Sequence, residues 1–248
     1  MIAFPHAYHY HLLAEVNSTN MYAMERIYAG MAVHGDVFFT EYQSQGKGQR
    51  GKSWKSAPGE SILMSIILDS SPLAASQSFR MSAAIAVAVK EFIEFVTGQS
   101  FLIKWPNDVY QGDRKAGGIL IENVLNGGNL KWSIVGIGIN VNQESFPGGI
   151  ANAVSCYLLT GKKYDSSELA QTLAGFVDHY WTLLISGGWQ EILTRYNDAL
   201  YGRSEIKRLR KGPVVIPCKI RRVDESGMLI AGENEEWNFR HGEVEWIF

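Results

Sequence analysis

The sequence is poor in cysteine, nearly balanced in charge and free of long apolar runs. Its two cysteines, Cys156 and Cys218, do not form the close pair of a metal-binding motif, so we expect two buried thiols. The net charge of -2 supplies no basic field that would attract nucleic acid. No stretch approaches the ~18 apolar residues of a membrane span, and Met1–Tyr10 lacks the pattern of a secretion signal. These absences, with no repeat or low-complexity segment, predict a cytoplasmic globular protein without a membrane or nucleic-acid partner.

The remaining composition is that of a folded chain. With 248 residues, 46% of them hydrophobic, the chain can form one large domain and a small appendage. Apolar residues at helical spacing predict helices, and short apolar runs between turn residues predict strands. The predicted helices are 20–29, 76–97, 166–186 and 189–201. The predicted strands before residue 202 are 37–40, 62–68, 101–105, 109–110, 119–124 and 132–141.

Beyond Gly202 the pattern changes to short strand-like segments separated by glycines. These segments are 214–223, 228–231, 237–239 and 244–247. A β unit of about 45 residues buries too little apolar surface to be stable alone. We therefore expect a small barrel that docks on the larger part of the chain.

A loop rich in glycine and cations lies between two predicted strands. It runs from Gly46 to Lys52 with three glycines and three cations, and Trp54 follows. Glycines let backbone N–H groups approach an anion, and flexible cations suit a phosphate or a carboxylate. The spacing matches neither a Walker loop nor a dinucleotide fingerprint. An ordinary mobile hairpin loop would have the same composition.

Two further segments carry polar groups at strand ends. Lys104-Trp105-Pro106-Asn107-Asp108 places a cation, an amide and a carboxylate where the chain must bend, and Lys115 precedes two glycines. These residues suit a polar ligand or Mg²⁺, although proline, asparagine and aspartate are also ordinary turn residues. Gly136-Ile137-Gly138-Ile139-Asn140 alternates, so the glycines form a flat face while the isoleucines face the core. That face suits a bound ligand or close packing of a helix.

In their order and spacing, these segments resemble the biotin–protein ligase family of the short bacterial type. The resemblance runs from Ser18-Thr19-Asn20 through Glu41-Tyr42-Gln43 and the segments above to the C-terminal strands. It implies an α+β fold: a mixed, mostly antiparallel sheet backed by helices, then a small SH3-like β-barrel. We expect a catalytic domain at residues 1–201 and a C-terminal domain at 202–248.

The resemblance also implies an activity and its partners. Such enzymes activate biotin with ATP as biotinyl-AMP and transfer biotin to a lysine of an acceptor, such as the biotin-carrier domain of acetyl-CoA carboxylase. Mg²⁺ is expected through the ATP phosphates, with no metal ligand assigned on the protein. Relatives form homodimers through a sheet edge. The 17 residues before Ser18 are too few for a winged helix, so we expect an enzyme and not a DNA-binding repressor.

The site residues that the resemblance implies fall into three groups. The biotin-binding residues are Ser18, Thr19, Asn20, Gln43, Gly46, Lys47, Gly48, Gln49, Lys115, Gly136 and Gly138. The ATP- or adenylate-binding residues are Arg50, Gly51, Lys52, Trp54, Lys104, Asn107 and Asn140. The catalytic residues are Lys115 and Arg50 as neutralising cations and Asp108 as a base or orienting group. Residues 152–159 are a candidate adenine contact.

Several alternatives remain open from the sequence. A lipoate–protein ligase or octanoyltransferase shares the fold, but such transferases rely on a cysteine, and Cys156 lies outside any supporting motif. A regulator that binds ligand without catalysis is the other alternative. Gln49 stands where relatives often carry arginine, so we expect charge to retain the adenylate less here. His6, His9 and His11 suggest a metal tract or, more simply, an N-terminal strand or ordered arm.

Overall fold

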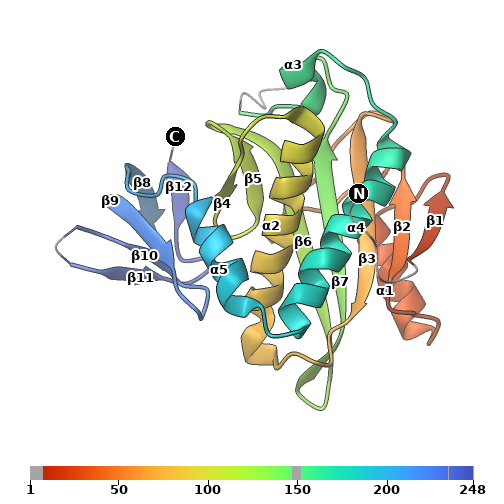
Figure 1. Ribbon diagram of the computed structural model, residues 1–248, viewed down its shortest axis with the longest axis horizontal. Helices are drawn as coiled ribbons and strands as arrows, with labels where there is room; N and C mark the ends of the chain where they lie inside the picture. The colour runs from red at the N-terminus through yellow and green to blue at the C-terminus, as the bar shows by residue number, and fades with distance from the viewer. Residues whose placement is uncertain (1–7, 147–151, 234, 248) are drawn as a thin grey trace.

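The computed structural model describes residues 8–146, 152–233 and 235–247 of the chain. A seven-stranded sheet with helices on its faces forms the larger part, and a five-stranded sheet stands beside it (Figure 1). The strands of the larger sheet are β1 (His9–Leu13), β2 (Asp36–Thr40), β3 (Ser61–Asp69), β4 (Leu102–Lys104), β5 (Asp108–Gln111), β6 (Arg114–Asn126) and β7 (Asn129–Asn140). The helices are α1 (Thr19–Tyr28), η1 (Gln49–Gly51), η2 (Ala75–Gln77), α2 (Ser78–Thr97), α3 (Cys156–Thr160), α4 (Ser166–Ile185) and α5 (Trp189–Asp198).

The larger sheet has the order β1-β2-β3-β7-β6-β5-β4. The β1–β2 pair is parallel, and every other pair is antiparallel, which confirms the prediction of a mixed, mostly antiparallel sheet. Side chains alternate between the two faces as strand geometry requires. In β2, for example, Phe39 belongs to the large core beneath the long helices, whereas Phe38 belongs to a smaller cluster with residues of α1.

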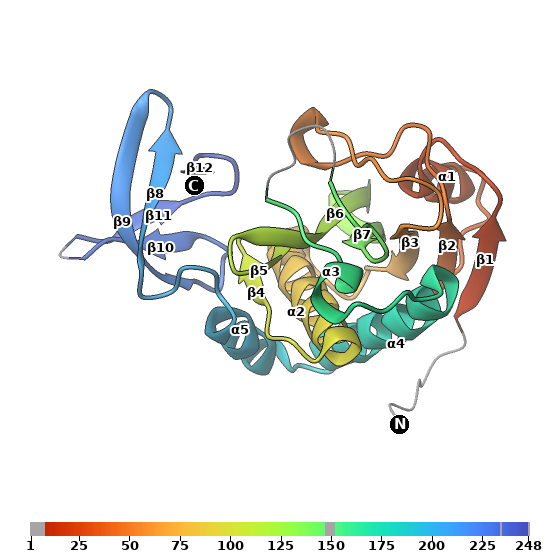
Figure 2. The ribbon, with the colours of Figure 1, turned by 90° about the horizontal axis from the view of Figure 1, so that it is seen from above.

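Helices α2 and α4 lie side by side across one face of the sheet, and α1 covers part of the other (Figures 1 and 2). Phe92 of α2 meets Phe176 of α4 edge-on at 5.8 Å between ring centroids. Helix α2 ends at Gly98, whose left-handed φ of 67° closes the helix, so the predicted end is confirmed. Because α1 is short, the rest of the opposite face remains available for a cavity.

Strand β7 lies at the centre of the sheet, between β3 and β6. Its Ile137 and Ile139 are buried in the core beneath the long helices. Gly136 and Gly138 therefore face the opposite side, where a Cβ would meet Asn20 and Trp54 respectively. The predicted alternation of glycines and isoleucines is confirmed, and it gives the sheet a face without side chains.

The C-terminal sheet has the order β11-β10-β9-β8-β12 with antiparallel pairs throughout. Its strands are β8 (Ile206–Lys211), β9 (Val214–Val223), β10 (Leu229–Ala231), β11 (Trp237–Phe239) and β12 (Glu245–Ile247). The strands described there form an open sheet, with β11 and β12 at its edges, instead of the expected closed barrel. The expected docking is present: Trp105 donates a hydrogen bond from Nε1 to the Gly227 carbonyl at 3.0 Å, and Asn197 of α5 hydrogen-bonds the backbone of Val223 in both directions.

Most predicted elements have the right type, and the differences have local causes. The helix predicted over 189–201 ends at Asp198 because Ala199 and Tyr201 pair with the backbone of Ile103 in β4. Strand β8 was not predicted because four of its six residues are cations, which hide the strand pattern. The predicted N-terminal strand is β1, and His6 lies outside the described residues. Within the described ranges no helix is long and apolar enough to cross a membrane.

Candidate active site

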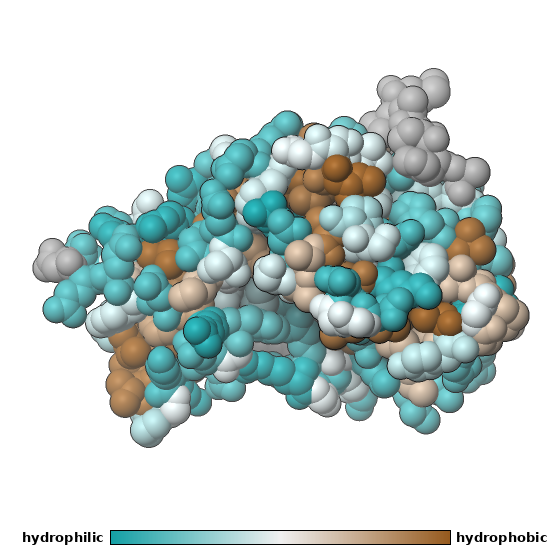
Figure 3. All heavy atoms as spheres, turned by 90° about the horizontal axis from the view of Figure 1, so that it is seen from below, coloured by the Kyte–Doolittle hydropathy of each residue, from teal (hydrophilic) through white to brown (hydrophobic). Residues whose placement is uncertain are grey.

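A cavity of about 680 Å³ opens between the face of the larger sheet and the C-terminal sheet. Its volume lies in the range typical of pockets for small ligands and cofactors. The walls come from the start of α1, the glycine-rich loop, strands β3, β6 and β7, the bend between β4 and β5, and β12 with the segment before it. In the view from below, the surface is hollowed between the C-terminal lobe and the main body (Figure 3).

Residues 46–54, which we call the flap, form a small hairpin over this cavity. Trp54 N–H donates to the Gly46 carbonyl at 2.8 Å, and Gly48 N–H donates to the Lys52 carbonyl at 2.7 Å. At the tip, Arg50 has a left-handed φ of 56°, which side chains rarely adopt. Gly46 is required for the hairpin because a Cβ there would lie 2.3 Å from the Trp54 carbonyl oxygen. The flap is therefore a loop held by backbone hydrogen bonds, with a strained backbone conformation at its tip.

Trp54 lies against the glycine face of β7. A Cβ on Gly138 would be 2.7 Å from the indole ring, so only glycine allows this contact. The Nε1 atom of Trp54 is buried and has no hydrogen-bond partner among the described residues. A buried donor without a partner is costly, so this N–H is suited to an acceptor on a ligand. The Lys115 ammonium lies 5.6 Å from the ring centroid.

One end of the cavity is built from amides and hydroxyls at the start of α1. Gln43 caps the helix: its Oε1 accepts from Thr19 N–H at 2.7 Å, so Gln43 replaces the side-chain cap that Ser18 does not provide. Ser65 of β3 donates to Asn20 Oδ1 at 2.6 Å, and Asn20 Nδ2 donates to Glu122 Oε2 at 2.7 Å. These contacts fix the polar side chains against the apolar residues of β3 and β6.

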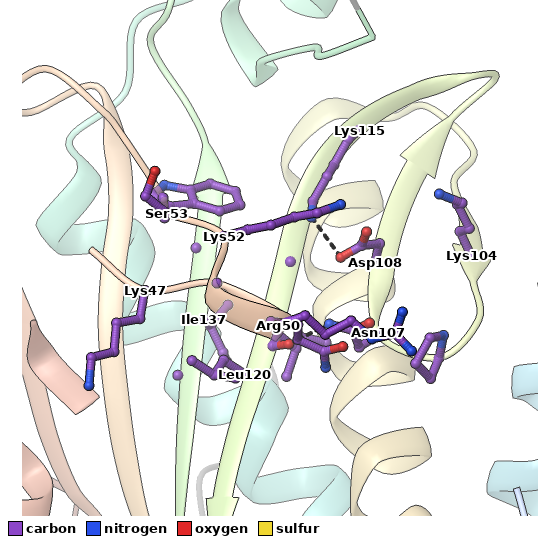
Figure 4. Close-up of a pocket in the computed structure, with 18 of the residues that line it drawn as sticks. Lys47, Arg50, Lys52, Ser53, Lys104, Asn107, Asp108, Lys115, Leu120 and Ile137 are labelled. Atoms are coloured by element: carbon purple, nitrogen blue, oxygen red, sulfur yellow. Dashed lines mark hydrogen bonds and ion pairs between the residues drawn. The ribbon is translucent and has the colours of Figure 1, made fainter. Parts of the chain in front are cut away.

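Cations gather at the other end of the cavity. The Lys115 ammonium lies 2.7 Å from Asp108 Oδ1, and both side chains are partly exposed. In Figure 4, Lys52 and Lys115 point toward Asp108, whereas Lys47 points to the opposite side of the flap. Arg50 at the flap tip lies near Asn107 in the same view, and all of these residues line the cavity. Such a cluster holds negatively charged groups well.

Lys104 is a further cation of this wall and is half-buried. Burial, opposed by Asp108 and reinforced by the charges of Lys115 and Lys52, lowers the pKa of Lys104 to about 8. Its ammonium donates to the Tyr110 hydroxyl at 3.3 Å and lies 5.9 Å from the centroid of the Trp246 ring. A cation held in an aromatic, partly dehydrated setting interacts strongly with an arriving anion.

The C-terminal sheet supplies part of the wall, which the sequence did not reveal. His241, Gly242 and Trp246 line the cavity, and His241 contacts Gln49 of the flap. Trp246 Nε1 donates to the Trp105 carbonyl at 3.3 Å. The sequence did predict that this sheet docks on the larger part of the chain. Histidine and tryptophan, the residue types of His241 and Trp246, are common in binding sites. Without the docking geometry no residue could be singled out.

The structure brings most of the predicted site residues together. Three of them do not line the cavity: Gly46 and Gly51 shape the flap, and Asn140 donates to the backbone carbonyls of Lys115 and Val154. Asn152 and Val154, from the segment expected near adenine, pair with the Lys115 backbone. The remaining predicted residues all line the cavity: Ser18, Thr19, Asn20, Gln43, Lys47, Gly48, Gln49, Arg50, Lys52, Trp54, Lys104, Asn107, Asp108, Lys115, Gly136 and Gly138.

The arrangement suits a reaction between two anions. A ligand can lie with its polar head at the start of α1 and its charged end among the cations, beside the Asn20 and Trp54 side chains that pack on the glycine face. The described residues include no group of three or more His, Cys, Asp or Glu side chains that could hold a metal ion. Cys156 is buried in the core and does not line the cavity, and burial raises the pKa of its thiol to about 12.

Comparison with known proteins agrees with this geometry. Residues 12–140 match the Biotin/lipoate A/B protein ligase family. Among curated proteins, the chain is 28% identical over 234 residues to the biotin–[acetyl-CoA-carboxylase] ligase of Paracoccus denitrificans, covering 88% of this chain and 92% of that one. It is 33% identical over 143 residues to the bifunctional ligase/repressor BirA of Escherichia coli, covering 57% of this chain and 43% of that protein. The chain thus spans less than half of that relative.

A solved structure extends the similarity over the whole fold. The biotin protein ligase of Aquifex aeolicus in complex with biotin and ATP aligns with a TM-score of 0.81 at 27% identity, covering 96% of this chain and 98% of that one. The matched family region includes α1, the flap, Lys115 and the glycine strand. The chain belongs to the Biotin/lipoate A/B protein ligase family, as its sequence predicted.

Proposed function

We propose that this protein is a biotin–protein ligase. It joins biotin and ATP into biotinyl-AMP with release of pyrophosphate, and then transfers the biotinyl group to a lysine of an acceptor protein. The observation that carries the proposal is the cavity itself, because it joins a pocket of amides and hydroxyls to a cluster of cations, with Trp54 packed on the glycine strand between them. The relatives named as biotin ligases support it.

In the first step the biotin carboxylate attacks the α-phosphorus of ATP, and pyrophosphate leaves. Two unit negative charges 4 Å apart repel by about 4 kcal/mol at an effective dielectric constant of 20. Lys115 and Arg50 are the principal groups that offset this repulsion, and Lys52 and Lys104 assist. Positioning and electrostatics account for catalysis of this kind, so no covalent enzyme intermediate is required. Trp54 donates its unpaired N–H to the adenylate and, with the flap, excludes water.

In the second step the amine of the acceptor lysine attacks the acyl carbon of the mixed anhydride, and AMP leaves with the bonding electron pair. Asp108, which lies 2.7 Å from the Lys115 ammonium, orients the amine and accepts its proton. Lys115 stabilises the oxyanion that develops on the acyl group. Lys115 thus acts in both steps, and its pairing with Asp108 places the two groups side by side.

Magnesium accompanies ATP in this proposal and supplies additional positive charge on the phosphates. Asp108 is a carboxylate that lies among the cations of the cavity wall, and one or two carboxylates with substrate phosphates are the usual protein ligands of Mg²⁺. We assign no resident metal ion to the protein.

The acceptor in this proposal is the biotin-carrier domain of a carboxylase such as acetyl-CoA carboxylase. Residues 1–201 act as the catalytic domain, and residues 202–248 form a C-terminal domain that completes the wall of the cavity. Two copies associate through a free sheet edge, as the family resemblance implies. Analytical ultracentrifugation with and without biotin and ATP tests the dimer.

The experiment that tests the activity supplies the protein with ATP, Mg²⁺ and either biotin or lipoate, and measures pyrophosphate release. A biotin-carrier domain is then added, and its intact mass is recorded. Biotin-dependent release and a mass increase of one biotinyl group support the proposal. Release with lipoate alone would make the chain a lipoate ligase of the same family. No pyrophosphate release with either acid would indicate a protein that binds ligands without catalysis.

A further inference from the structure

The flap and the C-terminal sheet meet at a contact that the reaction above does not use. Gln49 Oε1, at the flap tip, accepts a hydrogen bond from His241 Nε2 at 3.0 Å. Beside it, the Arg50 guanidinium packs closely on Gly242, where a Cβ would lie 2.4 Å from Nη2. The flap tip is thus held by two consecutive residues from the other end of the chain.

His241 is itself held in position. It lies in a turn in which Arg240 and Glu243 hydrogen-bond each other at 3.0 Å in both directions, and Gly242 adopts a φ of 96° that favours glycine. Its ring meets the Trp105 ring edge-on at 6.1 Å. Partial burial, then the Arg50 charge, lower the pKa of His241. The Gln49 Oε1 atom can only accept, so Nε2 of His241 carries the hydrogen of this bond.

We propose that His241 is a positioning residue that latches the flap over the adenylate through Gln49. This inference rests on the proposed function and adds how the intermediate is retained. Gln49 is neutral and adds no charge that would hold the phosphoryl group. Its hydrogen bond to the C-terminal sheet restrains the flap instead, and flap opening must break that bond.

The latch is tested on the full-length protein with His241→Ala, Gln49→Ala and the double variant. Biotinyl-AMP is formed in place, and its dissociation is followed after a chase with unlabelled biotin and ATP. Each single variant should release the adenylate about threefold faster, as expected for one partly solvated hydrogen bond. The double variant should be no faster than either single one, because both remove the same contact. His241→Gln should restore slow release, since its amide N–H can occupy the place of Nε2.

A control and a second readout separate the latch from other causes. His179→Ala removes an exposed histidine of α4 far from the flap and should change nothing. Without ligand, trypsin should cleave after the flap cations about threefold faster in both single variants, since the bond held the flap closed. Additive effects in the double variant, or unchanged rates in the single ones, would overturn the latch. If the wild type forms no biotinyl-AMP, the proposed function fails, and the trypsin rates still decide the latch.

Discussion

Gly138→Ala is the change that most sharply separates the closure of the flap from the stability of the fold. The new Cβ would lie 2.7, 2.9 and 3.0 Å from three atoms of the Trp54 ring. Ordinary carbon contacts begin near 3.5 Å, so the ring must move by roughly 1 Å. Trp54 is part of a loop whose other residues are largely exposed, and the flap can therefore lift away from the sheet at little cost to the core.

The size of the effect on ligand binding depends on which part of the structure takes up the strain. Overpacking by one methyl group costs about 1–3 kcal/mol, which here opposes flap closure instead of folding. Ligands that need the closed flap should bind roughly 5- to 150-fold more weakly, since 1.4 kcal/mol corresponds to a factor of ten. The free energy of unfolding should change by no more than about 0.5 kcal/mol, as for other changes outside the core.

Calorimetry with a non-hydrolysable analogue of biotinyl-AMP measures the first quantity, and urea denaturation measures the second. Gly117→Ala is the contrasting control, because its Cβ would meet the Gly138 carbonyl and Ile139 and Ile93 of the core, so it should lower stability. Trp54→Ala removes the obstacle, and Gly138→Ala should have no further effect in that background. Unchanged affinity in Gly138→Ala with Trp54 present would refute the closed position of the ring.

Three further predictions concern the cations and the core. Lys115→Ala should slow biotin-dependent pyrophosphate release at least about 100-fold, because it removes a neutralising charge worth several kcal/mol. The free energy of unfolding should change little, since the Lys115–Asp108 pair is partly exposed. An unchanged rate of release would exclude Lys115 from the chemistry. The Lys104 pKa of about 8 lies below its unfolded value of 10.5, so Lys104 is charged below pH 8 and loses its charge as the pH rises through 8. The KM for ATP should therefore rise with pH above 8, by up to about tenfold per unit, and Lys104→Arg should abolish the rise because arginine stays charged; the same slope in both proteins would contradict the assignment. Phe92→Ala should lower the free energy of unfolding by about 3–5 kcal/mol, since Phe92 is fully buried against Phe176, and a loss below about 1 kcal/mol in urea denaturation would show that the core is packed differently.

The spacing of apolar residues and glycines predicts the helices and strands whose structure depends mainly on residues close to one another in the sequence. Helix α2 and strand β7 follow from apolar spacing, and the two faces of β7 follow from the alternation of glycine with isoleucine. Asn140 shows where such reasoning stops. It lies in the family's motif, yet its amide binds backbone carbonyls of Lys115 and Val154, a choice that depends on how distant segments pack.

The part of the site that could not be predicted comes from long-range pairing. The role of Gln43 as the cap of α1 depends on a loop that returns 24 residues later in the chain. The position of His241 and Trp246 depends on the docking of a sheet that carries no recognisable motif. Strand β8 itself is concealed by its cations, most of which are exposed while Leu209 is buried. Sequence periodicity reports burial along one segment and contains no information about which segments meet.

The cavity wall that Trp246 completes has a consequence for synthesis on the ribosome. The polar end of the pocket is encoded before residue 66, whereas the wall beside Lys104 awaits the last strand of the chain. Contacts this distant in sequence form late and slowly. A nascent polypeptide would therefore lack this wall of the cavity until translation is nearly finished.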